Sequence, residues 1–183
     1  MATPGATGLA TLEDARRVLL EDAVRAAPLV RAEEGPVVDV GSGSGSPGVP
    51  LAVLLPDRPF SLLEAERRKC EFLGRVTADL PNVEVVWGRA EERPLEGEGV
   101  ALAKALARPP VATELCLPLV RLGGAAILWV GETVDLEHVS RVADALGARL
   151  DSAKAGLVVL RKVAPTPTGF PRRPGTAKKR PLP

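Results

Sequence analysis

Residues 39–48, DVGSGSGSPG, combine one carboxylate with closely spaced glycines. Glycine lets a ligand approach the backbone because no Cβ stands in the way. The flanking stretches 37–40 and 49–55 are apolar, which argues against a solvated spacer. Pro47 suits the first turn of a following helix, whose free N–H groups could receive part of a ligand. The pattern therefore predicts a ligand-binding loop between a strand and a helix.

Two ligand classes fit these glycines. Residues 43–48 match the G-x-G-x-x-G loop of dinucleotide-binding proteins, and residues 39–45 match the D-x-G-x-G-x-G loop of S-adenosylmethionine-dependent methyltransferases. Asp39 favours the second class, because a carboxylate suits the cationic amino end of methionine, whereas a dinucleotide would place its pyrophosphate near this loop. Glu64 ends the next apolar stretch, where an acid can bind both ribose hydroxyls. Glu64 thus indicates a nucleoside in either class.

Strand and helix patterns alternate along the chain. Thr11 is expected to cap one amphipathic helix that runs to about residue 30. Strands are expected at 37–41, 60–64, 82–88, 100–106, 125–130 and 157–163, with helices at 47–55, 65–80, 110–119 and 135–146. Repeated βα units predict an α/β fold with a mostly parallel sheet, helices on both faces, and ligands beyond the carboxyl ends of the strands.

Composition narrows the remaining classes of function. The 183 residues are enough for one domain with its own core. We find no secretion signal and no apolar run of about 20 residues, so we expect a cytoplasmic protein without membrane contact. Cys70 and Cys116 lack a second ligand cluster, which favours buried thiols over a disulfide or a metal site.

The charge distribution is lopsided. Residues 152–183 hold 8 Lys/Arg and no Asp/Glu, which leaves 16 basic against 23 acidic residues in 1–151. Such a basic end is typical of nucleic-acid contact, although a merely solvated end has the same composition. Aromatic residues make up only 3% of the chain, so stacking of bases on rings is not expected as the main mode of RNA binding.

The stretches VDVGSGSGSPGVPLAVLLPDRPFSLLEAERRKCEFL and NVEVVWGRAEE, and above all the ending FPRRPGTAKKRPL, resemble the bacterial RsmG family, also called GidB. The resemblance covers about residues 11–183. Members of this family methylate N7 of guanine in small-subunit (16S) ribosomal RNA. The resemblance therefore implies a Rossmann-like class I methyltransferase fold, S-adenosyl-L-methionine as the cofactor, and small-subunit ribosomal RNA or the 30S particle as the partner; we expect a monomer.

Residue roles carry over from this resemblance position by position. Gly41 through Ser46 match the cofactor loop of the family, and Ala90 with Glu91 match the pair that holds the adenosine end. Lys104 stands where the family has the Arg of its SRA segment, another cofactor contact. Ser46 replaces a larger apolar residue, and Val130 stands where a Lys before Gly is usual. The predicted cofactor-binding residues are Asp39, Gly41, Gly43, Gly45, Ser46, Glu64, Ala90, Glu91 and Lys104.

Methyl transfer to guanine N7 uses the free lone pair of that atom, so it needs alignment and no deprotonation. We therefore assign no catalytic residue. A methyltransferase domain over residues 1–169 is expected to be followed by a basic, Pro-rich arm over 170–183. The arm would contact RNA phosphates through Arg172, Arg173, Lys178, Lys179 and Arg180.

Two other interpretations remain open. The departures at Lys104 and Val130 would fit a non-catalytic factor with the same fold that binds ribosomal RNA or assists ribosome assembly. The glycines and Glu64 would also fit a nicotinamide-dependent oxidoreductase. That enzyme class leaves the basic end unexplained, and a chain of this length shows no substrate domain for it.

Overall fold

The computed structural model describes residues 11–183, and a seven-stranded sheet forms its centre. The strand order is β3-β2-β1-β4-β5-β7-β6. The first five strands in the chain run parallel, and the last two form an antiparallel hairpin on β5. The strands are β1 (Val37–Val40), β2 (Phe60–Glu64), β3 (Val83–Trp87), β4 (Glu98–Ala103), β5 (Val120–Trp129), β6 (Ala148–Lys154) and β7 (Leu157–Lys162). The predicted α/β fold with a mostly parallel sheet is confirmed.

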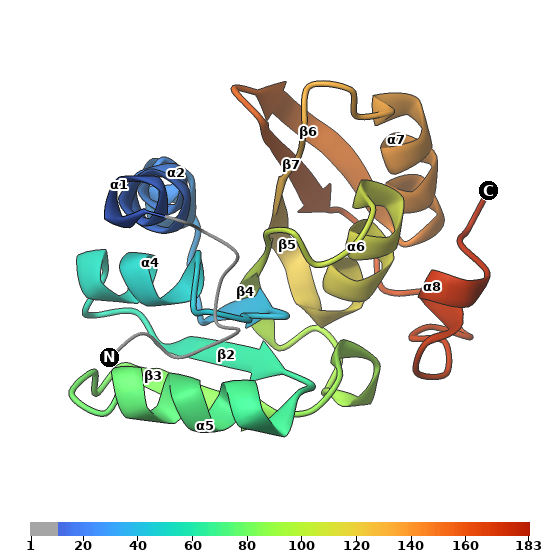
Figure 1. Ribbon diagram of the computed structural model, residues 1–183. Coiled ribbons are helices and arrows are strands. Elements are labelled where there is room, and N and C mark those ends of the chain that lie inside the picture. Colours follow the sequence, from blue (N-terminus) through green and yellow to red (C-terminus); the bar gives the residue numbers. More distant parts are fainter. Residues whose placement is uncertain (1–10) are drawn as a thin grey trace.

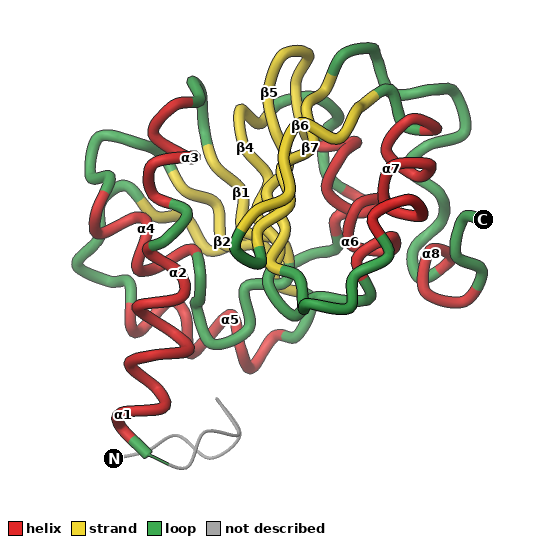
Figure 2. Tube along the Cα trace, turned by 90° about the horizontal axis from the view of Figure 1, so that it is seen from above, coloured by secondary structure: helices red, strands yellow, loops and turns green. Residues whose placement is uncertain are grey.

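Helices cover both faces of this sheet (Figure 1). In Figure 2, α2, α3 and α4 lie on one side of the strands and α6, α7 and α8 lie on the other. The helices are α1 (Leu12–Ala15), the π-helix η1 (Arg16–Glu21), α2 (Asp22–Val24), α3 (Ala27–Ala32), α4 (Gly48–Leu54), α5 (Arg67–Val76), the short turns η2 (Ala90–Glu92) and η3 (Leu117–Leu119), α6 (Pro109–Cys116), α7 (Leu136–Ala145) and α8 (Thr176–Lys179). None of the helices in residues 11–183 combines the length and apolar character that crossing a membrane requires.

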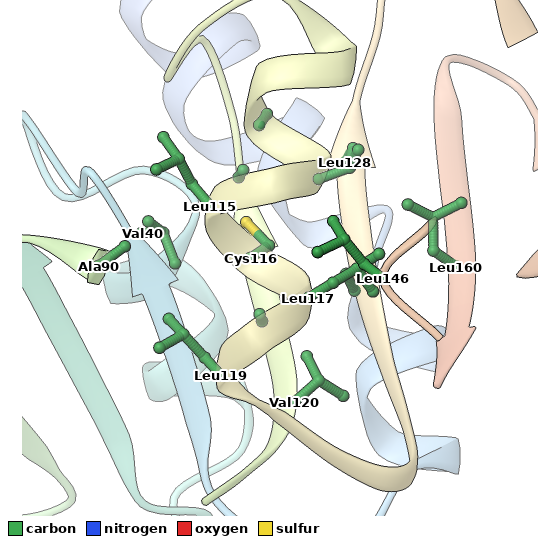
Figure 3. Packing of buried hydrophobic residues seen from close by; sticks show 14 of the residues in the cluster. Val40, Ala90, Leu115, Cys116, Leu117, Leu119, Val120, Leu128, Leu146 and Leu160 are labelled. Atoms are coloured by element: carbon green, nitrogen blue, oxygen red, sulfur yellow. The ribbon is translucent and has the colours of Figure 1, made fainter. Parts of the chain in front are cut away.

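Two apolar clusters hold the layers together, because successive residues of a strand point to opposite faces of the sheet. Val37 belongs to the cluster under α3 and α4, whereas its neighbour Val38 belongs to the larger cluster under α6 and α7. Figure 3 shows Leu115 on the side of Val40 and, one residue past the end of α6, Leu117 turned toward Leu146. This packing fixes α6, whose Leu115 also borders a pocket at the carboxyl ends of the strands.

The N-terminal helix differs from the prediction. Thr11 does cap it, with its side chain accepting a hydrogen bond from the N–H of Asp14. The predicted continuous helix is wrong, since α1, η1 and α2 are followed by a turn at Arg25 and Ala26 before α3 begins. Pro28 lies in the first turn of α3. Proline has no N–H to donate to the preceding turn, so a helix ends before it.

Strand β6 has no counterpart in the sequence-based prediction. Four of its seven residues are polar and most are exposed, because β6 is an edge strand with only β7 as a neighbour. The hairpin turn between them uses Ala155 and Gly156 at φ angles of 51° and 75°. Polar edge strands lack the buried alternation by which strands are recognised in a sequence.

Candidate cofactor site at the carboxyl edge of the sheet

The glycine loop joins β1 to α4. Gly41, Gly43 and Gly45 have φ angles of 73°, 55° and 96°, a region that L side chains rarely adopt. A Cβ at Gly41 would lie 2.5 Å from Leu106 Cδ1, and one at Gly45 would lie 2.8 Å from Val49 Cγ2. At Gly43 the nearest atom would be 3.7 Å away. The loop is therefore packed at its two outer glycines and open to a ligand at the middle one.

Asp39 closes this loop from the inside. Its Oδ2 accepts a hydrogen bond from the backbone N–H of Gly48 at 3.0 Å, and the residue is 1% exposed. Burial raises the pKa of Asp39 to about 7, against the opposing effect of the Gly48 N–H. Asp39 is not among the residues that line the pocket. The predicted contact with the amino group of a methionine moiety thus has no support in this geometry, and Asp39 instead fastens the two ends of the loop.

Glu64 meets the loop where β2 ends beside β1. Its Oε2 accepts a hydrogen bond from the N–H of Gly43 at 2.9 Å, and its Oε1 accepts one from the N–H of Glu66 at 2.8 Å. The parallel register pairs Val40 with Leu63, which brings both elements to the same edge. Glu64 is 8% exposed and lines the pocket. The structure brings Glu64 and the loop together, and contact of Glu64 with a ribose stays a prediction.

A pocket of about 230 Å³ opens beside Glu64. Part of its wall is apolar, formed by Leu63, Ala90, Leu106 and Leu115. An apolar wall beside a carboxylate suits a nucleoside, since the base can pack against the wall while the ribose hydroxyls donate to the carboxylate. The residues present therefore fit the adenosine part of S-adenosylmethionine.

The predicted adenosine pair, Ala90 and Glu91, borders this pocket. Ala90 is 7% exposed and belongs to the larger core cluster. Glu91 has a second contact, because its Oε1 accepts a hydrogen bond from the N–H of Gly175 at 2.9 Å. Gly175 and Lys178 line the pocket as well. The C-terminal segment 170–183 is therefore part of the pocket wall, which its sequence did not indicate.

Lys104 and Ser46 face the N-terminal helices. The Lys104 ammonium lies 2.8 Å from Asp22 Oδ2 and donates to the backbone carbonyl of Val18. The Ser46 hydroxyl donates to the carbonyl of Leu19 at 2.8 Å, and it lies 3.5 Å from the Lys104 Nζ. Neither residue lines the pocket. Two of the three departures from the family pattern thus meet in one place and hold residues 18–22, and a cofactor contact by either is not supported by this geometry.

The five basic residues of the C-terminal segment divide into two groups. Nε and Nη2 of Arg172 donate to Oε1 and Oε2 of Glu114 at 2.6 and 2.5 Å, and Glu114 is 4% exposed. This bond raises the pKa of Arg172. Because this pairing occupies Arg172, a phosphate contact by Arg172 is not supported by this geometry and stays a prediction. The other four are exposed: Arg173, Lys178, Lys179 and Arg180.

Sequence reasoning missed the acids that hold the two chain ends. Glu114 is the single charged residue of the stretch VATELCLPL, and an acid in so apolar a stretch signals a buried ionic partner. Asp22 has no such signal, because it belongs to an ordinary charged helix surface in the sequence. Cys116 is buried as predicted, whereas Cys70 is half-buried, with its Sγ 3.4 Å from the carbonyl oxygen of Glu64.

Comparison with known proteins gives a family for this chain. The family model of the rRNA small subunit methyltransferase G, GidB, matches residues 6–158. The ribosomal RNA small subunit methyltransferase G of Carboxydothermus hydrogenoformans is 38% identical over 164 residues, which cover 79% of this chain and 70% of the relative. The protein of the same name from Acetivibrio thermocellus is 29% identical over 195 residues, covering 95% and 81%.

Solved structures with the same architecture agree with the fold. A SAM-dependent methyltransferase from Aquifex aeolicus superposes with a TM-score of 0.60 at 17% identity, covering 81% of this chain and 93% of that one. A SAM-dependent O-methyltransferase from Thermotoga maritima gives 0.62 at 14%, covering 80% and 66%. At sequence identities this low, the superpositions establish the class I methyltransferase fold and nothing about function. Together with the family match, they show that the chain is an S-adenosylmethionine-dependent methyltransferase that belongs to the rRNA small subunit methyltransferase G family, GidB.

Proposed function

We propose that this protein transfers a methyl group from S-adenosylmethionine to N7 of a guanine in small-subunit ribosomal RNA. Within the molecule, one observation carries the proposal: Glu64, which accepts the N–H of Gly43, lines a pocket whose partly apolar wall suits a nucleoside. Family membership supports the ribosomal RNA substrate, and the resemblance of the glycine-loop and C-terminal motifs to RsmG proteins supports guanine N7. We expect a cytoplasmic monomer that acts on naked RNA or on the assembled small subunit.

Glu64 can hold a ribose without giving up the loop. Each of its carboxylate oxygens accepts one backbone N–H, from Gly43 and Glu66. A carboxylate oxygen has more than one acceptor direction, so two ribose hydroxyls can donate to Glu64 while both backbone contacts stay in place. The base would then pack against Ala90 and Leu115, and the methionine part would pass the open side of Gly43.

Methyl transfer to N7 requires no proton transfer by the protein side chains. When bound, S-adenosylmethionine supplies a methyl group on a positively charged sulfur. Guanine N7 contributes its own lone pair, so one N–C bond forms as one S–C bond breaks, and no proton moves. The pocket residues have to fix the line of approach and keep water away, an effect worth up to about 7–11 kcal/mol in well-oriented reactions. No general base is assigned for this reason.

The C-terminal segment would place the RNA. Arg173, Lys179 and Arg180 are exposed, and Lys178 is exposed while also lining the pocket. Phosphate contacts by such cations fix the register of an RNA without reading its sequence. The segment thus would hold phosphates on its outer side while its inner side closes the cofactor pocket.

Methyl incorporation into small-subunit RNA from cells that lack this protein tests the proposal. Naked RNA and assembled subunits are offered separately, and mass spectrometry of the digested RNA identifies the modified nucleoside. Gly43→Val should abolish transfer and cofactor binding, since its side chain would enter the open side of the loop at a φ of 55°. Gly123→Val is the matched control, because Gly123 on β5 also has a positive φ, 83°, and a Cβ there would meet nothing within 4 Å.

Three results would contradict the proposal. Methylation at an atom other than N7 would overturn the assigned target, and methylation of large-subunit RNA would overturn the assigned substrate. Binding of both cofactor and RNA with no transfer to either preparation would instead support a non-catalytic assembly factor.

A further inference from the structure

Trp87 stands apart from the other aromatic residues of this protein. Trp87 is the last residue of β3, which forms one edge of the sheet, and it is 64% exposed. Phe60 is buried, and Phe72, Trp129 and Phe170 are half-buried. All five aromatic residues of the chain lie within the described residues. A single large ring in water therefore marks the edge strand next to the cofactor pocket.

The exposed ring is held in a fixed orientation. Its Nε1 donates a hydrogen bond to the backbone carbonyl of Ala65 at 3.1 Å. The guanidinium of Arg67, on the first turn of α5, lies over the ring at 5.7 Å from its centroid. A ring that is already oriented loses less conformational freedom when a partner stacks on it than a freely rotating side chain does.

Cations from three separate segments lie over this ring or line the neighbouring pocket. Arg67 follows β2, Arg89 follows β3, and Lys178 lies on α8. Arg89 and Lys178 are exposed, line the pocket, and make no ion pair in residues 11–183. Ala65 also lines the pocket, which puts the carbonyl that holds Trp87 at the pocket edge. In Figure 1 the arrowhead of β2 points toward the side of the molecule where α8 lies.

Most acids of the same segments already have partners. Glu66 lies 3.0 Å from Lys69, and Glu71 lies 3.3 Å from Arg67, which keeps a side chain 73% exposed. Glu91 accepts the N–H of Gly175, and Glu92 is left exposed. Arg89 and Lys178 have no acidic partner within residues 11–183, so both remain available to the phosphates of a polyanionic partner.

We propose that Trp87, Arg67, Arg89 and Lys178 form a platform for single-stranded RNA, with an unpaired base stacked on the indole and phosphates on the cations. An aromatic face bordered by cations is the combination that binds unpaired nucleotides. The cofactor is the weaker candidate for this ring, because Trp87 lies outside the pocket lining. The platform rests on the proposed RNA substrate. It extends the RNA surface from the C-terminal segment onto the acidic body of the protein.

Titration with a short labelled single-stranded RNA, at several salt concentrations, tests the platform in the full chain. Trp87→Ala should weaken RNA binding about 5- to 150-fold, the range expected for one base stacked on one ring. Trp87→Phe should restore most of that loss. The RNA should also quench tryptophan fluorescence of the wild type, and this quenching should disappear in Trp87→Phe although the variant still binds.

The cations have a matched control at the opposite edge of the sheet. Arg89→Ala should lower the slope of log affinity against log salt by about 0.7, the value for one phosphate contact on a single strand. Arg149 is exposed on β6, the other edge strand, and makes no ion pair in the described part of the chain. Arg149→Ala should leave the slope unchanged.

The outcomes separate the platform from the proposed function. If the wild type binds RNA and Trp87→Ala binds equally well, the platform is wrong and the proposed function stands. Loss of S-adenosylmethionine affinity without loss of RNA affinity would make Trp87 a cofactor residue and overturn the platform. Loss of binding only to protein-containing subunits would make it a protein-docking site. A wild type that binds no single-stranded RNA would overturn the platform, and the methyl-incorporation assay would still decide the proposed function separately. Unchanged thermal unfolding of each variant confirms that the comparison is made between folded proteins.

Discussion

The two ends of the described chain flank the glycine loop, and they are held by different forces. On the N-terminal side, α1 and η1 bury no residue, and Leu12 is 91% exposed. Their attachment is polar, through Ser46 and Lys104, which donate to the carbonyls of Leu19 and Val18. The Trp129 indole adds a hydrogen bond to the carbonyl of Asp22 at 3.1 Å.

The C-terminal segment is part of the core. Ala177 is 2% exposed and belongs to the larger apolar cluster, against which Phe170 and Leu182 also pack. The ion pair of Arg172 with Glu114 joins the segment to α6. The pocket wall on this side is therefore supported by buried apolar area as well as by charge.

The difference indicates which side of the site can open. Burial of apolar side chains contributes more to stability than polar contacts that remain partly in water. Local opening of residues 12–24 should therefore require less free energy than release of residues 170–183. We expect residues 170–183 to stay in place in the wall of the proposed cofactor pocket, and residues 12–24 to be the segment that opens.

Arg172→Ala has the largest expected effect, since it would break the C-terminal attachment. Glu114 would stay buried without a partner, which costs about 3–5 kcal/mol of unfolding free energy. Cofactor affinity should fall as well, because Gly175 and Lys178 would leave the pocket wall. Urea unfolding and calorimetric titration measure the two losses.

Arg173→Ala is the control for this change. Arg173 is the exposed neighbour of Arg172 and makes no ion pair within residues 11–183. Its removal should spare stability and weaken only RNA binding. Equal stability losses in the two variants would show that the buried ion pair does not anchor the segment.

Asp39→Asn tests the glycine loop, which lies between the two chain ends. Its expected effect on stability comes from the ionisation of Asp39 and not from the attachment of either end. The pKa of Asp39 is about 7 in the folded protein and near 3.8 ordinarily, so the folded state binds more protons between these pH values. Stability contributed by Asp39 therefore falls as the pH rises from about 4 to 7. The amide cannot ionise, so the variant should gain on the order of 4 kcal/mol over the wild type at pH 8, relative to their difference at pH 4. Unfolding at both pH values decides this, and a constant difference would refute the raised pKa.

Lys104→Met should loosen the N-terminal side alone. The aliphatic stem stays, while the contacts with Asp22 and the Val18 carbonyl are lost, at about 1 kcal/mol for a partly exposed charged contact. Amide hydrogen exchange should accelerate in residues 12–24 about fivefold and remain unchanged in 170–183. Unchanged exchange with a large loss of cofactor affinity would instead restore Lys104 as a cofactor contact.

Ser46→Ala should have the smallest effect, because it removes one neutral hydrogen bond to Leu19, worth about 0.5–1.5 kcal/mol. It sharpens the comparison through a double-mutant cycle with Lys104→Met. The Ser46 Oγ and Lys104 Nζ are 3.5 Å apart and hold neighbouring carbonyls, so their effects on exchange should couple by about 0.5 kcal/mol or more. Strict additivity would mean that the two residues hold the helix independently.

The sequence by itself determined the order of strands and helices, the glycine loop, and the meeting of Glu64 with that loop. These features depend on local patterns: β-branched runs, helical periodicity, and glycines at positive φ. Placement at one edge then follows, because parallel strands all end on the same side of the sheet. The edge strand β6 escaped this reasoning because exposure removes its pattern.

Only the tertiary structure decided which charged side chains form ion pairs that stabilise the fold. Lys104 and Arg172 look like ligand contacts in the sequence, yet their partners Asp22 and Glu114 lie 82 and 58 positions away. The strength of such a pair depends on how far the packed chain removes both groups from water, which no local pattern encodes. The same packing left Trp87 in solvent at the end of an edge strand, where a sequence with few aromatic residues gave no reason to expect a binding surface.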